Sequence, residues 1–140
     1  MVASTLDFYT PIIKRSINTN VTGSYTLISA CTLALKPAKD NSGSTIDAPV
    51  YRITGYIGNG TVGVRGVILS RSNDASDFDT LANMYCKAEQ DSAGSLSLTC
   101  NAVAYNNDTS APTAYKYVYC WVKGAGTGTG RVYTIAERLG

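Results

Sequence analysis

The segment that most constrains the fold is 114–123, because its side chains alternate strictly. Tyr115, Tyr117, Tyr119 and Trp121 fall on one face, and Lys116, Val118, Cys120 and Val122 fall on the other. A period of two residues is that of a β-strand, whereas a helix repeats every 3.6 residues. We therefore expect a strand here, with a row of four aromatic side chains along one face.

Similar alternation at 25–35, 81–90 and 95–105, together with runs of β-forming residues elsewhere, predicts an almost all-β protein. Strands are expected at 25–35, 50–58, 61–69, 81–90, 95–105, 114–123 and 131–138. The composition agrees, because 13 Ser, 16 Thr, 13 Gly and 10 Tyr stand against only 2 Glu, and these residue types favour strands and turns over helices. The expected fold is an antiparallel β-sandwich or small barrel of about six or seven strands, with less than about 15% helix.

A turn signal predicts that two of these strands form a hairpin. Asn59-Gly60 stands between the strands expected at 50–58 and 61–69. Asn-Gly suits a type I′ turn, because that turn needs a positive φ at both central positions. We therefore expect the two flanking strands to pair directly.

A second hairpin is predicted further along the chain. Ser92-Ala93-Gly94 forms a three-residue loop between the strands expected at 81–90 and 95–105, with Gly94 in the left-handed conformation. The resulting register places Cys86 opposite Cys100.

The first 22 residues differ from the rest and are expected to form an extended arm, followed by a single β domain at 23–140. They have no sustained period, and Pro11 blocks a helix. They nevertheless carry the large apolar side chains Leu6, Phe8, Tyr9, Ile12 and Ile13. Such an arm packs either on its own domain or on a neighbouring subunit.

Four cysteines, at positions 31, 86, 100 and 120, show no C-x-x-C spacing, so a zinc site is not expected. The N-terminal residues lack the cationic start and apolar stretch of a secretory signal. This favours buried thiols in a cytoplasmic protein. For an extracellular protein, the register above favours a Cys86–Cys100 disulfide.

Several classes of function are not expected from this sequence. It contains no histidine, which removes His-based acid–base, nucleophilic and metal chemistry. The net charge is only +2, with no basic block, so nucleic acid is not an expected partner. No apolar run approaches 18 residues, so no membrane partner is expected.

Two local motifs resemble ligand sites only superficially. The glycines of 124–130 lack the Lys-Ser/Thr of a phosphate loop and the third glycine of a dinucleotide site. Asp74, Asp77 and Asp79 lack the spacing of a calcium loop and fit a solvated loop before a short helical turn near 76–81. We expect no catalytic, cofactor or metal site, and no enzyme.

The expected functional residues are those of an interface. They are Leu6, Phe8, Tyr9, Ile12 and Ile13 of the arm, and Tyr115, Tyr117, Tyr119 and Trp121 of the aromatic row. Core packing or a subunit contact is the expected role of the row, and a platform for a ligand is the alternative.

In its length, its lack of histidine, its Thr-, Ser- and Gly-rich strands, its N-terminal arm and its end at 130–140, the chain resembles the cement or decoration proteins of tailed-phage capsids. The resemblance implies a virion protein assembled in the host cytoplasm. It also implies symmetric self-association, with a trimer favoured, on the major capsid protein or other virion subunits.

Two other functions remain open. A secreted carbohydrate-binding module would use the Tyr/Trp row to stack on sugars. A fibre or pilus subunit would use the arm as a strand donated to its neighbour.

Overall fold

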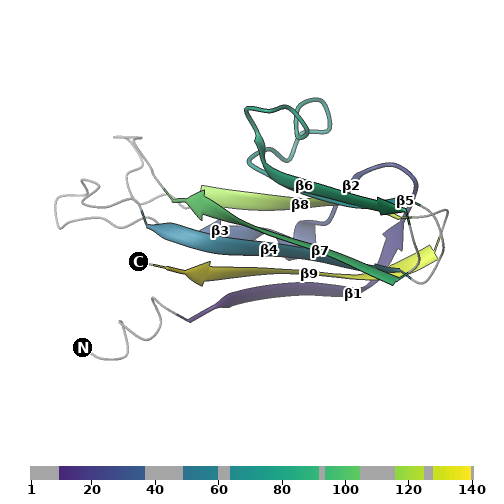
Figure 1. Cartoon of the computed structure of the whole chain (residues 1–140), viewed down its shortest axis with the longest axis horizontal. Helices are drawn as coiled ribbons and strands as arrows, with labels where there is room; N and C mark the ends of the chain where they lie inside the picture. Colours follow the sequence, from purple (N-terminus) through teal and green to yellow (C-terminus); the bar gives the residue numbers. More distant parts are fainter. Residues whose placement is uncertain are drawn as a thin grey trace.

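The computed structural model describes residues 10–36, 49–59, 64–91, 94–104, 116–124 and 128–139, which form two antiparallel β-sheets (Figure 1). These residues contain nine strands and one 3-10 turn, and no α-helix. The elements are β1 (Ile12–Val21), β2 (Thr26–Leu27), η1 (Ser29–Cys31), β3 (Leu33–Leu35), β4 (Val50–Asn59), β5 (Val64–Ser70), β6 (Met84–Asp91), β7 (Gly94–Val103), β8 (Lys116–Lys123) and β9 (Gly128–Arg138). The predicted all-β antiparallel sandwich is confirmed.

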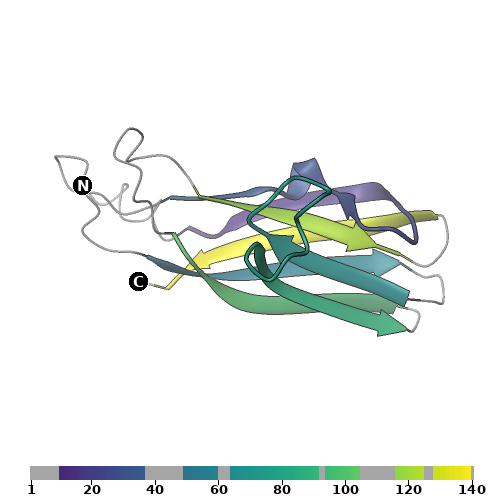
Figure 2. The ribbon, with the colours of Figure 1, turned by 90° about the horizontal axis from the view of Figure 1, so that it is seen from above.

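Strands from the first half of the chain pair with strands from the second half, in reverse order. The pairs are β1 with β9, β2 and β3 with β8, β4 with β7, and β5 with β6. Sheet I has the order β1-β9-β4-β7, and sheet II has the order β2-β8-β5-β6, with β3 also on β8. Figure 2 shows β9 between β1 and β4. With β2 and β3 counted as one interrupted strand, this is the eight-stranded jelly roll, a sandwich of two Greek keys.

Two stretches explain why there are nine strands instead of six or seven. Residues 12–21, expected within the arm, form β1 and pair with β9 in the domain's own sheet. The strand expected at 25–35 is divided by η1, where the Cys31 N–H donates to the Ile28 carbonyl. The interruption turns Cys31 toward β9, where Thr134 Oγ1 donates to the Cys31 carbonyl at 2.7 Å.

The two predicted hairpins are wrong. β4 and β5, on either side of Asn59-Gly60, lie in different sheets, and so do β6 and β7. A strand has two edges, and both edges of β4 are already paired, with β7 and β9. Gly60, Ser92 and Ala93 lie outside the described residues. Gly94 does have the predicted positive φ, +110°.

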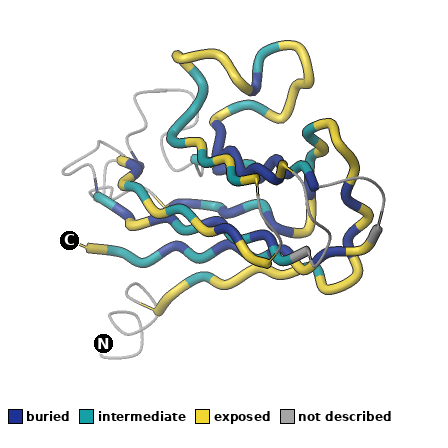
Figure 3. The backbone as a smooth tube through the Cα atoms, turned by 45° about the vertical axis from the view of Figure 1, so that its right-hand side comes forward, coloured by how far each residue is buried: buried dark blue, intermediate teal, exposed yellow. Residues whose placement is uncertain are grey.

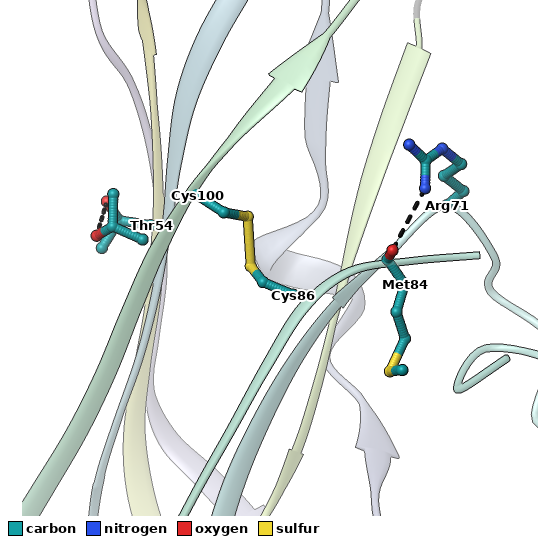
Figure 4. The surroundings of a disulfide bond; sticks show 6 residues. Thr54, Arg71, Met84, Cys86 and Cys100 are labelled. Carbon is teal, nitrogen blue, oxygen red and sulfur yellow. Dashed lines mark hydrogen bonds between the residues drawn. A yellow bond between two sulfur atoms is a disulfide. The ribbon is translucent and has the colours of Figure 1, made fainter. Parts of the chain in front are cut away.

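One disulfide joins the two sheets. Cys86 on β6 is bonded to Cys100 on β7, with their Cα atoms 6.5 Å apart (Figure 4). This is the pair expected of an extracellular protein, but it bridges sheet II to sheet I because β6 and β7 are edge strands of different sheets. The prediction of thiols is wrong for this pair. Cys31 and Cys120 are free and buried.

The core lies between the sheets and is formed by alternate residues of each strand. On β4, Tyr51, Ile53 and Ile57 are buried, while the intervening Arg52 is exposed, an alternation visible along the tube in Figure 3. The residues on the outer faces are therefore those that remain available for contacts with other molecules.

Residues 71–83, called the 71–83 loop below, connect β5 to β6 and fold back over the outer face of sheet II (Figures 1 and 3). The helical turn expected near 76–81 is present only as isolated turns. The Phe78 N–H donates to the Asp74 carbonyl at 3.0 Å, but no helix forms.

Candidate functional site

The outer face of sheet I carries a groove of mixed apolar and basic character along its β1 edge. Val132, Thr134 and Ala136 of β9 are buried, so the alternate residues of that strand face outward. The ladder then places Ile13 opposite Ile135, and Arg15 opposite Tyr133. Two strands from opposite ends of the chain thus build one surface.

This β1–β9 groove has a volume of about 530 Å³. It is lined by Ile13, Arg15, Ile17, Arg131, Tyr133 and Ile135. Ile13 is 53% exposed and Ile17 is 61% exposed, and both side chains line the same surface, so they form an exposed apolar patch. The groove therefore combines an apolar floor with two arginine side chains.

A pair of stacked tyrosines adjoins the groove. Tyr133 and Tyr56 are cross-strand neighbours, with ring centroids 4.5 Å apart and planes within 14° of parallel. Gly58 provides the space, because a Cβ at that position would come within 2.6 Å of the Tyr56 hydroxyl. Since the rings stack on each other, at most one face of each is left for a ligand.

The predicted aromatic row is only partly exposed. Tyr115 lies outside the described residues, Tyr117 is 46% exposed, Tyr119 is half-buried and Trp121 is buried. Phe78 of the 71–83 loop stacks on Trp121 at a centroid distance of 3.9 Å. With Ile68, these two rings form a second small core outside sheet II.

The backbone of the 71–83 loop also holds Trp121. The Trp121 Nε1–H donates to the Ser72 carbonyl at 3.0 Å. The sequence pattern of 114–123 could not predict that Trp121 is buried, because the residues that cover it belong to a loop far away in the chain.

Hydrogen bonds fix the shape of the 71–83 loop. Ser70 Oγ donates to the Phe78 carbonyl at 2.7 Å, and Asn83 Nδ2 donates to the Asp77 carbonyl at 2.9 Å. Ser72 Oγ donates to the Asp77 carboxylate. Leu81, within this braced loop, is 92% exposed.

The acidic residues of the loop take part in local bonding or face solvent. The Ser76 N–H and hydroxyl both donate to Asp74 Oδ1, and these bonds lower the pKa of the Asp74 carboxyl. Asp79 is exposed. Among the described residues, no group of three or more His, Cys, Asp or Glu side chains is arranged to hold a metal ion.

The arm residues fall into two groups. Leu6, Phe8 and Tyr9 lie outside the described residues. Ile12 packs toward the core, whereas Ile13 faces outward into the β1–β9 groove. Of the residues that line the groove, only Ile13 was selected from the sequence, and sequence reasoning missed Arg15, Ile17, Arg131, Tyr133 and Ile135. The alternation at 131–138 was the signal that marked the last two as sharing a face.

A polar cluster lies on the outer face of sheet II. Tyr25 OH donates to Glu89 Oε1 at 2.7 Å, and the ammonium groups of Lys87 and Lys123 lie 3.3 and 3.2 Å from the same oxygen. The Tyr25 hydrogen bond, followed by those of the two lysines, lowers the pKa of Glu89. Burial, then the contact with Glu89, raises the pKa of Tyr25.

In the described part of the chain, no helix is long and apolar enough to cross a membrane. No protein-family model matches the chain, and no curated protein matches its sequence.

Solved structures do resemble the chain. A pilus subunit of Bacillus endospore appendages is 16% identical over 94% of this chain and 90% of its own, with a TM-score of 0.45. A chain of cowpea mosaic virus empty particles is 10% identical over 94% and 82%, with a TM-score of 0.46. A CBM4 chain is 10% identical over 94% and 88%, with a TM-score of 0.36. All three TM-scores lie below 0.5.

Proposed function

We propose that this protein is a non-enzymatic structural protein of a virus particle, a cement or decoration protein that binds a phage shell through symmetric self-association. The observation that carries the proposal is the β1–β9 groove, a surface on the outer face of a sheet that combines exposed isoleucines with two arginines. The jelly-roll topology also supports it, because viral capsid domains are among the proteins that use this fold.

The groove has the physical character of a surface that is covered in an assembly. Burying a fully exposed isoleucine contributes about 1.5–3 kcal/mol before ordering costs. Ile13 and Ile17 are 53% and 61% exposed, so each could contribute roughly half of that in an assembly. Among the described strands, β1 also pairs on one side only. Its other edge is open for hydrogen bonds with a neighbouring chain.

The proposed partners are further copies of the chain, with a trimer favoured, and the major capsid protein or other virion subunits. The Cys86–Cys100 disulfide fits a protein that persists outside the cell, because such bonds last in oxidising surroundings. The proposed location is the virion, with assembly in the host cytoplasm before release.

The test is to measure the mass of the purified protein by light scattering after size exclusion and to image it in negative stain. We expect small closed rings, and binding to shells from which the protein has been stripped. A protein that stays monomeric over the whole accessible concentration range, or that does not bind stripped shells, would refute the proposal.

The open edge of β1 favours a second candidate, a fibre or pilus subunit assembled by strand exchange. The same images separate the two functions, because a subunit of this kind forms open filaments instead of rings.

A further inference from the structure

We propose that the 71–83 loop of one copy docks into the β1–β9 groove of the next copy, so that the subunits associate head to tail. This inference rests on the self-association proposed above and names the surfaces that meet. Figure 1 shows the loop above sheet II and β1 at the opposite side of the sandwich. A copy therefore cannot fill its own groove with its own loop, whereas a neighbour can.

The loop is already shaped for binding. The hydrogen bonds from Ser70 and Asn83 and the stack of Phe78 on Trp121 fix its backbone before any partner arrives. Little conformational freedom is then lost on association, which is what makes a preorganised loop an effective anchor. It presents Leu81, 92% exposed, as an apolar side chain for a hydrophobic floor.

The 71–83 loop and the β1–β9 groove also carry opposite charges. Asp74 and Asp79 of the loop are exposed, while the groove carries Arg15 and Arg131. The one cation of the loop, Arg71, is engaged within its own chain, because its guanidinium lies 3.9 Å from the centre of the Tyr85 ring. An acidic loop with an apolar tip thus faces a basic groove with an apolar floor.

Charge also disfavours pairing of two grooves with each other. A two-fold contact would bring Arg15 and Arg131 of one copy against the same residues of the other. Like charges placed together at an interface oppose association. The contact is therefore heterologous, and it closes into a ring or continues as a filament according to the rotation between subunits.

The first experiment places a carboxylate on each surface in turn. Leu81→Asp and Ile17→Asp change highly exposed side chains, so both proteins should keep the wild-type circular dichroism and melting temperature. Each should weaken self-association at least about tenfold by sedimentation. Val103→Asp is the matched control, because Val103 is 50% exposed on β7, the far edge of sheet I, and its variant should assemble normally.

The second experiment mixes the two defective proteins. The Leu81→Asp protein keeps an intact groove and the Ile17→Asp protein keeps an intact loop, so head-to-tail docking predicts a heterodimer that grows no further. A contact between identical surfaces predicts no such dimer, and its absence would overturn the proposal. Asp79→Arg provides a second loop variant, which must also weaken assembly.

The outcomes separate this inference from the proposed function. If the wild-type protein never self-associates, the proposed function fails. If it assembles and the Leu81→Asp and Ile17→Asp proteins assemble equally well, the docking contact alone is refuted.

Discussion

Phe78 covers Trp121, a side chain that the alternating pattern of its own strand places on the outer face of sheet II. Its ring stacks on Trp121 and joins the second small core, with 8% of its surface exposed. Phe78→Ala should lower the free energy of unfolding by about 3 kcal/mol, since it leaves a cavity over Trp121. Urea unfolding measures the loss. Because Trp121 is the single tryptophan, its emission should also shift to longer wavelength in the folded variant.

Leu81→Ala is the control for this prediction, since the same loop carries both residues. Leu81 is almost fully exposed, so its truncation should change stability by less than about 0.5 kcal/mol. Equal effects of the two substitutions would show that Phe78 does not hold the loop to the sheet.

Cys31 should make stability depend on alkaline pH. Burial raises the pKa of its thiol from 9.0 to about 11. Between these values the unfolded chain releases the proton while the folded chain retains it, so the contribution is complete below pH 9 and is lost as pH rises to 11. The free energy of unfolding, measured in urea across this range, should fall more steeply for wild type than for Cys31→Ala. Parallel curves would contradict the prediction.

At the scale of elements, the Cys86–Cys100 bond ties an edge strand of one sheet to an edge strand of the other. It closes a loop with a sequence separation of 14 residues. Replacing both cysteines by serine should lower the free energy of unfolding by about 3 kcal/mol, chiefly by freeing the unfolded chain. Urea unfolding of oxidised protein measures this.

Thiol titration checks the same bond independently. The denatured, unreduced protein should react at two thiols, those of Cys31 and Cys120, and at four after reduction. Four reactive thiols without a reductant would show that the bond is absent.

Strand positions could be predicted from sequence much better than strand partners. The alternation at 95–105 located β7, and the runs of β-forming residues at 50–58 and 131–138 located β4 and β9, because strand preference and facing are local properties of each residue. The signal at Asn59-Gly60 is local too, but whether β5 lies beside β4 depends on β7 and β9 occupying both edges of β4. Similar short-range reasoning found the Cys86–Cys100 pair through a hairpin that does not exist.

The candidate site was predictable only in part, for a related reason. Ile13 was recognisable as an apolar residue without a partner in its own segment. The groove, however, depends on the register that sets Ile13 against Ile135 and Arg15 against Tyr133. No local pattern encodes a pairing between the first and last strands of a chain.

For the whole molecule, the proposed docking contact predicts a response to salt. Raising the ionic strength from 0.1 to 1 M shortens the Debye length from about 10 to about 3 Å. Attraction between the acidic loop and the arginines of the groove should then weaken self-association roughly fivefold, as measured by sedimentation. Arg131→Gln should reduce this dependence. Stronger association at high salt would indicate a purely apolar contact instead.

The position of β9 has a consequence for how the chain is made. Among the described strands, β9 is synthesised after all the others, yet it lies between β1 and β4 in sheet I. While residues 128–138 are still inside the ribosome, the first strand has no neighbour and β4 has a partner on one side only. Sheet I is therefore completed only once residues 128–138 have left the ribosome, and a chain truncated before β9 would leave the exit tunnel with β1 unpaired.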